Sequence, residues 1–398
     1  MLGHPDRALA GAADRVGSAS LPFGIFTIRI ALIAHIRHPI APPFMGGMES
    51  HFHGLARGLD AAGHSVTSFA AGGSDLPNLK AICTQPCEEI YPRERFAGSD
   101  ALQAYQLSAF RLAWDCIASG NFDAVHNNSL FPEVIDWAVR DGIAMVTSQH
   151  VPPFKAMREK VHGVLGDERQ QITVTSRHQK GLWSADDPPN LSVVHNGIDL
   201  TRWQPSARRH DRLLWYGRIT PNKGLALAIK SAAIADRPLD IIGTIEDRAY
   251  FEVEIAPYLT GKIRYLGHLS GPQLHEAVAA SRAVVATPMW DEPFGLVAAE
   301  ALSSGVPVLA FDRGALREVV GPCGIIVPAA DIAALARAMQ EPDLPGPSVC
   351  RQRAEQCFSI TQMIAGYERC YCAAMKAQAG TGGDSSASSA FKTTLLLA

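Results

Sequence analysis

Two glutamates with seven residues between them are the first chemically suggestive feature of the chain. They belong to the run Asp291 to Glu300 (DEPFGLVAAE), in which Glu292 is expected in a loop and Glu300 about two turns into the following helix. Ionised carboxylates accept several hydrogen bonds and therefore suit a hydroxyl-rich ligand. The unpaired N–H groups at the start of the helix suit a phosphate. The same pattern is also typical of a loop glutamate that complements a helix dipole and a second one that faces solvent.

A basic turn precedes this acidic run in the sequence. It reads Tyr216 to Gly224 (YGRITPNKG) and is expected between a strand and a helix. Arg218 would leave the end of the strand and Lys223 would lie at the start of the helix, so two cations and a helix dipole could converge. A diphosphate is the natural ligand for that arrangement. The alternative is an exposed turn whose two cations are merely solvated.

A glycine loop near the N-terminus could also bring backbone close to a phosphate. It reads Pro42 to Ser50 (PPFMGGMES) and contains Gly46 and Gly47. A tight turn without any ligand is the alternative. The loop has no GxGxxG pattern and the chain has no GxxxxGK[ST] pattern, which argues against a dinucleotide dehydrogenase and a P-loop enzyme.

These turns follow strands that alternate with helices, which predicts an α/β fold. Ile28 to Ile36 (IRIALIAHI) is almost continuously apolar and β-branched, as a strand covered on both faces requires. The helix after the glycine loop has an apolar stripe at three- and four-residue spacing. Further strands are expected at 64–70, 122–125, 143–148, 172–176, 212–216, 239–243, 264–266, 283–287, 306–311 and 324–327.

The length of 398 residues exceeds what one hydrophobic core usually organises, so two domains are expected. We predict two doubly wound parallel sheets facing a cleft, in domains 28–205 and 206–357, with a hinge near 200–210. Residues 358–376 are predicted to form a helix that crosses back to the first domain. Residues 1–27 are predicted to be a disordered leader, and residues 377–398, which are rich in Gly, Ser and Ala over 377–389, a flexible tail.

Composition excludes several classes of function. A formal net charge of −3 and a pI near 6.5 give no field that would gather nucleic acid. The 8 cysteines lack paired CxxC spacing, so no metal site is expected and a reducing cytoplasm is the simplest location. Leu21 to Ile36 is apolar, but Arg29 interrupts it and no clean cleavage site follows, which disfavours a signal peptide. No stretch reaches the roughly 18 uncharged apolar residues of a membrane span.

Taken together and in order, these features resemble the family 4 retaining glycosyltransferases of GT-B fold. The resemblance extends over roughly 28–371 and includes the glycine loop, His126 in AVHN, the basic turn and the glutamate pair. The turn Asn196 to Asp199 (NGID), Gly305 to Val308 (GVPV), and Gly314 followed by Glu318 complete it. Each motif alone is weak, and their combination is highly specific.

The resemblance implies a role for each group. Glu300 would bind the ribose hydroxyls of a nucleotide, Glu292 the hydroxyls of the donor sugar, and Arg218 and Lys223 the diphosphate. His126 would lie near the donor sugar at the reacting face, and with Arg218, Lys223 and Glu292 it completes the expected catalytic set. The remaining substrate contacts are expected from Gly46, Gly47, Gly217, Phe294, Gly295, Leu296 and Val297.

The implied reaction is transfer of a hexose-type sugar from a UDP-, GDP-, ADP- or dTDP-sugar to a hydroxyl acceptor, with retention and without a cofactor or metal. Fixed cations would stabilise the charge that grows on the departing diphosphate. The acceptor could be a carbohydrate, a lipid-linked glycan or a small molecule, as in synthesis of a bacterial polysaccharide, glycolipid or glycoside. A sugar-nucleotide epimerase of the same fold and a non-catalytic sugar-nucleotide-binding protein remain the alternatives.

Two segments of the first domain stay ambiguous. Phe154 to His162 mixes cations with apolar residues, so it could contact the inner face of a cell membrane, although an ordinary solvated helix is favoured. His150 to Pro153 follows an expected strand and could line an acceptor site or form a rigid turn.

Overall fold

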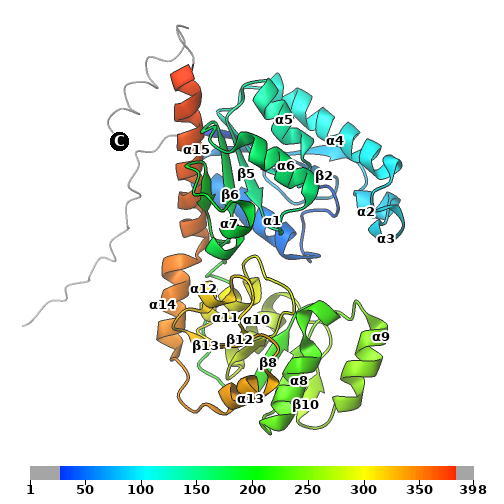
Figure 1. Ribbon diagram of the computed structural model, residues 1–398, viewed down its shortest axis with the longest axis vertical. Coiled ribbons are helices and arrows are strands. Elements are labelled where there is room, and N and C mark those ends of the chain that lie inside the picture. The colour runs from blue at the N-terminus through cyan, green and yellow to red at the C-terminus, as the bar shows by residue number, and fades with distance from the viewer. Residues whose placement is uncertain (1–26, 382–398) are drawn as a thin grey trace, which may run out of the picture.

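The computed structural model describes residues 27–381. Of the expected leader, residues 1–27, all but Thr27 lie outside the described residues, and so do residues 382–398 of the expected tail. Two parallel α/β domains lie one above the other along the long axis of the molecule (Figure 1). The predicted fold class of two doubly wound parallel-sheet α/β domains is confirmed.

The first domain contains a seven-stranded parallel sheet of order β3-β2-β1-β4-β5-β6-β7. Its strands are apolar enough to be covered on both sides, and buried clusters lie on each face. The strands are β1 Arg29–Ala34, β2 Ser65–Ala71, β3 Leu79–Cys83, β4 Ala124–Asn128, β5 Met145–Gln149, β6 Gln170–Val174 and β7 Leu191–Val193. The helices are α1 Gly47–Ala61, α2 Cys87–Ile90, α3 Arg93–Phe96, α4 Asp100–Ala118, α5 Glu133–Arg140, α6 Lys155–Val164 and α7 Arg177–Trp183.

The second domain contains a six-stranded parallel sheet of order β10-β9-β8-β11-β12-β13. Buried clusters again lie on both faces. The strands are β8 Leu213–Tyr216, β9 Leu239–Ile242, β10 Ile263–Tyr265, β11 Val284–Ala286, β12 Val308–Phe311 and β13 Gly324–Val327. The helical segments are η1 Pro221–Lys223, α8 Leu225–Ile234, α9 Arg248–Tyr250, η2 Phe251–Ile255, η3 Ala256–Tyr258, α10 Gly271–Ala280, α11 Leu296–Ser303, α12 Leu316–Val320, α13 Ile332–Gln340 and α14 Pro347–Cys357.

Both sheets reverse their strand order at one point, between β1 and β4 in the first and between β8 and β11 in the second. In open α/β sheets, ligands bind beyond the carboxyl ends of the strands at such a switch point. The glycine loop follows β1, the basic turn follows β8 and the acidic loop follows β11. The topology therefore places all three predicted motifs at switch points.

The chain crosses between the domains twice, and the two crossings lie side by side. Ile198 forms a parallel bridge with Ser359 and its N–H donates to the carbonyl of Phe358 at 2.6 Å. A Cβ on Gly197 would lie 2.8 Å from the Cα of Ile360, so only glycine allows this approach. The glycine of the NGID turn therefore serves the crossing between the domains.

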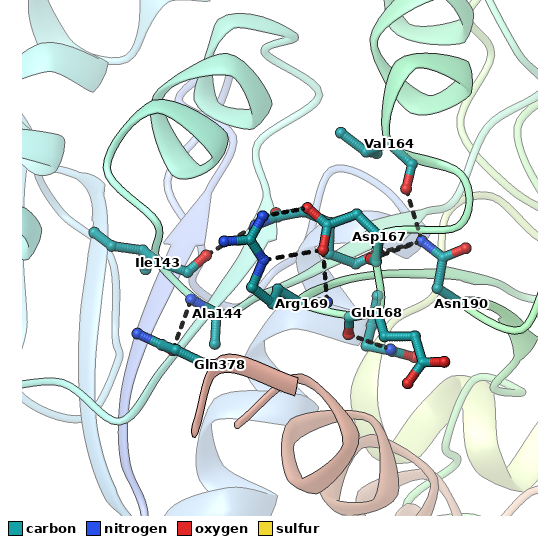
Figure 2. A network of polar contacts seen from close by, with 10 residues as sticks. Ile143, Ala144, Val164, Asp167, Glu168, Arg169, Asn190 and Gln378 are labelled. Atoms are coloured by element: carbon teal, nitrogen blue, oxygen red, sulfur yellow. Dashed lines mark hydrogen bonds and ion pairs between the residues drawn. The ribbon is translucent and has the colours of Figure 1, made fainter. Parts of the chain in front are cut away.

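The last helix, α15 Ile360–Thr381, runs along the first domain (Figure 1). It packs on α1, where Cβ atoms added to Gly58 would lie 2.9 Å from Ile360 and Ile364. The helix was expected over 358–376 and extends five residues into the expected tail, because its Ala-rich end favours helix. Gln378 in that extension accepts a hydrogen bond from the N–H of Ala144 at 3.1 Å (Figure 2).

Figure 2 also shows how polar side chains close the loop between α6 and β6. The amide of Asn190 donates to the carbonyls of Val164, Asp167 and Gln170 at 2.9, 3.1 and 2.6 Å. Arg169 forms a two-pronged contact with Asp167 at 3.0 and 2.9 Å. These contacts fix the loop that enters β6, a strand against which α15 packs.

One expectation about the limits of a strand is wrong. The strand expected at 122–125 is β4 Ala124–Asn128, whose polar end is fully buried and therefore hid its length. Near the domain boundary predicted at 205, Ile198 and Trp203 pack in the core of the second domain, whereas Val194 packs in the first. The change of core therefore comes several residues earlier than the loss of periodicity suggested.

Candidate active site

The basic turn is built by the close approach of two strands. Gly217 follows β8 with a φ of 150°, and a Cβ on Gly243, which follows β9, would lie 1.7 Å from the carbonyl oxygen of Gly217. Ile219 and Ile245 then form a bridge that sets Arg218 beside Glu246. The Nη1 of Arg218 lies 2.9 and 3.1 Å from the two carboxylate oxygens of Glu246. Both side chains are about half exposed, so this cation is accessible but already paired.

Lys223 ends the short turn η1 and precedes Gly224, whose positive φ of 67° caps α8. A Cβ at Gly224 would lie 2.0 Å from the carbonyl of Thr287, so the turn rests directly on the chain leaving β11. Lys223 was expected at the helix start and instead lies just before the cap. Its ammonium group forms an ion pair with Glu292, and both side chains are largely buried.

The acidic pair has the predicted placement, with Glu292 in the loop after β11 and Glu300 in α11, but Glu300 is the fifth residue of that helix, little more than one turn from its start instead of about two. The hydroxyl of Tyr216, at the end of β8, donates to Glu300 at 2.9 Å. Desolvation raises the pKa of the Glu300 carboxyl to about 7, although this hydrogen bond opposes the shift. Tyr216 immediately precedes Gly217 and Arg218, so Glu300 lies next to the basic turn.

Among the residues between the glutamates, Phe294 packs its side chain in the core, and the next three residues place their backbone at the start of α11. Phe294 is 2% exposed and its ring lies against His195 and Phe358, with centroids 5.9 and 5.6 Å apart. Its side chain therefore cannot touch a substrate, and only its backbone could do so. Gly295 has a φ of 91° and starts α11, so the N–H groups of Leu296 and Val297 belong to the first turn of that helix.

The glycine loop of the first domain meets this helix. Gly46 caps α1 in an extended conformation and Gly47 is the first helical residue. A Cβ on Gly47 would lie 2.5 Å from Cδ1 of Leu296. Thr175 of the first domain also donates to the carbonyl of Pro293 at 2.9 Å. The two domains are therefore in contact where their predicted binding loops face each other.

Lys223, Glu292, Glu300 and Arg218 thus lie at the carboxyl ends of the neighbouring strands β8 and β11, with Gly47 opposite. Residues that are up to 254 positions apart in the chain, from Gly46 to Glu300, gather around one junction between the domains. No group of three His, Cys, Asp or Glu side chains that could hold a metal ion occurs within residues 27–381.

His126 does not join this group. It lies in the interior of β4 and has no exposed surface. Its Nδ1 lies 2.6 Å from the hydroxyl of Tyr371 and its Nε2 lies 2.6 Å from the hydroxyl of Ser148. Burial lowers the pKa of His126 to about 3, so the ring is neutral. The predicted position at the reacting face does not match this structure, because His126 precedes the end of its strand by two residues.

A polar cluster that the sequence did not reveal as a set lies beyond the carboxyl ends of β1, β4 and β5 and in the first turns of α1. Asn128 ends β4 and lies 3.1 Å from Nε2 of His150, which follows β5. The rings of His51 and His150 are 4.1 Å apart, and His35 pairs with Glu49 at 3.4 Å. Burial lowers the pKa of His150 to about 4, and burial lowers the pKa of His51 well below its ordinary value. Position in the sequence was the usable signal for three of these residues, because His35 and His150 follow strands and Asn128 ends one, whereas Glu49 and His51 lie in α1.

Two hollows on the surface lie away from these residues. One of about 760 Å³ lies beside the linker, between Arg202 and His275, and a smaller one of about 310 Å³ lies between Arg209 and Pro347. Neither contains a residue of the gathered set. In α6 the apolar residues Met157 and Val161 are fully buried, so they are not available to a membrane surface.

Two family profiles match the chain. The profile described as Glycosyltransferase Family 4 matches residues 45–202, and the one described as Glycosyl transferases group 1 matches residues 201–341. The chain belongs to the family 4 glycosyltransferases. It is therefore a glycosyltransferase enzyme.

The curated relatives of this glycosyltransferase act on different acceptors, as their names state. Glycogen synthase of Mycobacterium tuberculosis is 27% identical over 79% of this chain and 86% of its own length. D-inositol 3-phosphate glycosyltransferase of Gordonia bronchialis is 27% identical over 79% of this chain and 81% of its own.

Among solved structures, Anabaena Alr3699/HepE in complex with UDP-glucose covers 86% of this chain and 98% of its own with a TM-score of 0.61. At 16% sequence identity that likeness concerns the fold. Within residues 27–381, no helix of this glycosyltransferase is both long and apolar enough to span a membrane.

Proposed function

We propose that the protein transfers a hexose from a nucleoside diphosphate sugar to a hydroxyl acceptor, with retention of configuration and without a metal. The observation that carries this proposal is the ion pair between Lys223 and Glu292 beside the first turn of α11. A cation for phosphate, a carboxylate for sugar hydroxyls and free backbone N–H groups are thereby held together at a switch point.

The donor would lie with its diphosphate between Arg218, Lys223 and the first turn of α11. Its ribose hydroxyls would donate to Glu300, and its sugar hydroxyls to Glu292. Gly46 and Gly47 would approach the phosphates from the first domain. The complex of Anabaena HepE with UDP-glucose, a protein of the same fold, favours UDP-glucose as the first donor to test.

The reaction follows from where charge develops. The bond between the anomeric carbon and the β-phosphate oxygen breaks, and negative charge grows on the departing diphosphate. Arg218 and Lys223 stabilise that charge at fixed positions. The acceptor hydroxyl bonds to the anomeric carbon on the same face, and its proton passes to the departing phosphate oxygen. No protein base is required, which accords with the interior position of His126.

The acceptor is proposed to bind to the first domain and to be part of a bacterial polysaccharide, glycolipid or glycoside. The different acceptors named for the relatives leave the choice to experiment. All eight cysteines are free thiols, which supports a location in the reducing cytoplasm.

The donor is tested by a thermal-shift panel of UDP-, GDP-, ADP- and dTDP-glucose, because a ligand that binds only the native state raises the melting temperature. The best donor, carrying a labelled sugar, is then incubated with acceptors and the anomeric configuration of the product is read by NMR. An α-linked product from an α-linked donor is expected. An epimerised nucleotide sugar, or binding without any product, would instead support the alternatives.

The assignment of the cations is tested by Arg218→Ala and Lys223→Ala. Each is expected to lower turnover by about a hundredfold or more with little change in melting temperature, because each removes charge stabilisation in the transition state. Matched controls are Arg248→Ala and Lys262→Ala, which remove exposed, ion-paired cations elsewhere on the second domain. Full activity in both site variants would refute the assignment.

A further inference from the structure

Trp290 touches both members of the central ion pair, although nothing in the sequence marked it. It precedes Glu292 by two residues in the loop after β11 and is partly buried. Its indole Nε1 donates to Oε1 of Glu292 at 3.1 Å. The ammonium group of Lys223 lies over its ring, 5.2 Å from the centroid. One side chain therefore contacts the groups expected to hold the diphosphate and the sugar.

The two contacts constrain different groups. Oε1 of Glu292 accepts hydrogen bonds from both Trp290 and Lys223, whereas Oε2 has no hydrogen-bond partner among residues 27–381. The carboxylate is thereby oriented with one oxygen engaged and the other free to accept from a hydroxyl. The ring face attracts the Lys223 ammonium through its quadrupole and limits where that flexible side chain can lie.

The loop that carries Trp290 is itself fixed to the turn that carries Lys223. The N–H of Met289 donates to the carbonyl of Asn222 at 2.8 Å. The hydroxyl of Thr287 donates to the carbonyl of Gly224 at 3.0 Å. Because the backbone holds the two segments together, exchange of the Trp290 side chain should leave the loop in place.

We propose that Trp290 is a positioning residue of the donor site, whose indole N–H orients Glu292 toward the sugar and whose ring holds Lys223 toward the diphosphate. This inference rests on the proposed function and adds a residue to that same site. It predicts that the two contacts can be separated by substitution, since phenylalanine keeps a ring and lacks the N–H, whereas leucine lacks both.

The test compares binding of a nucleoside diphosphate with that of its glucose conjugate by calorimetry. UDP and UDP-glucose are the first pair, followed by the GDP, ADP and dTDP pairs, and the pair that binds the wild type best is used. Trp290→Phe is expected to weaken the glucose conjugate about five- to tenfold and the diphosphate less than twofold. Trp290→Leu is expected to weaken both by about fivefold or more. Met289→Leu on the same loop is the control.

A double variant separates positioning from a general loss of structure. In a Glu292→Gln background, Trp290→Phe should have little further effect on the glucose conjugate, because the orientation of the carboxylate no longer matters. Equal weakening of both ligands by Trp290→Phe, or an undiminished effect in the Glu292→Gln background, would overturn the role of Trp290 alone. Should Trp290→Leu fail to fold, Trp290→Phe still decides the question. Absence of wild-type binding to every pair would overturn the proposed function, and this inference with it.

Discussion

At the scale of single residues, Glu300 has an electrostatic cost that binding can relieve. Its carboxyl group is desolvated in α11 and has a pKa of about 7, whereas the ordinary value is 4.5. A ribose hydroxyl would donate to the ionised form and favour it. The unliganded protein therefore carries a carboxylate that is poorly solvated at neutral pH.

Glu300→Gln is expected to stabilise the unliganded protein above pH 7. Below pH 4.5 both folded and unfolded states are protonated. Between about 4.5 and 7 the folded state alone holds the proton, so stability falls as pH rises, by at most about 3 kcal/mol. Glutamine cannot ionise, so the variant should not lose stability in this range. Urea unfolding at pH 4.5 and pH 8 measures the free energy of unfolding of the variant and the wild type, with Glu276→Gln as an exposed control. A difference between variant and wild type that does not change with pH would contradict the prediction.

Glu246→Gln is expected to strengthen donor binding. This carboxylate is paired with Arg218 and would compete with the proposed diphosphate for it. Exposed ion pairs contribute about 0.2–1 kcal/mol, so affinity should rise by about 1.4- to fivefold at low salt. Calorimetry with the best donor at 0.05 and 0.5 M salt checks this, because screening should remove the gain.

The matched control for that variant is Glu252→Gln, which unpairs Arg248 on a neighbouring exposed helix. Weaker donor binding by Glu246→Gln would mean that Glu246 assists the donor rather than competing with it. In that case Glu246 would contact the nucleotide in the bound state.

At the scale of elements, the first residue of α1 lies so close to the first turn of α11 that no side chain fits between them. Gly47→Ala should lower turnover about tenfold, because its Cβ would lie 2.5 Å from Leu296 and force the two domains apart. Leu296→Ala should restore activity in the double variant, since it removes the clashing atom and leaves the backbone. Steady-state kinetics measures both.

Gly163→Ala in α6 is the control for that experiment, because an added Cβ there meets no atom within 4 Å. It should leave turnover unchanged and slightly raise the melting temperature, as alanine favours helix over glycine. Unchanged turnover in Gly47→Ala would show that the contact between the loops does not limit catalysis.

At the scale of the whole molecule, Glu318 of α12 joins the domains. It accepts from the N–H of Arg177, at the start of α7, and from Nε2 of His195, each at 2.8 Å. Desolvation raises the pKa of Glu318, but the hydrogen bonds from His195 and Arg177 outweigh it and the net shift is downward. The contribution to stability is therefore present above pH 4.5 and is lost as pH falls further.

Glu318→Ala is expected to lower transfer turnover about tenfold while donor affinity changes less than twofold, because catalysis needs both domains and the charged side chains proposed to bind the donor all belong to the second. Small-angle scattering should show a broader distribution of distances between the domains. Glu254→Ala, which removes a partly exposed partner of Lys230, is the control. A large loss of donor affinity would instead place Glu318 in the donor site.

The sequence alone was sufficient for features that depend on neighbouring residues. Apolar runs located the principal strands, and the spacing from Glu292 to Glu300 placed one in a loop and the other in the helix. It missed the edge strands β3 and β7, because β3 is largely exposed and β7 has only three residues, so neither has a continuous apolar run. An apolar pattern in the sequence reveals a strand only where the strand is long and buried, and β3 and β7 are too exposed or too short to produce such a pattern.

Only the tertiary structure decided which distant groups meet. It paired Lys223 with Glu292 and Arg218 with Glu246, brought Trp290 onto both members of the first pair, and put His126 in the interior behind Asn128. These outcomes depend on the approach of separate strands and on the contact between Gly47 and Leu296. Such contacts arise from packing between segments far apart in the chain, and no spacing within a single segment encodes them.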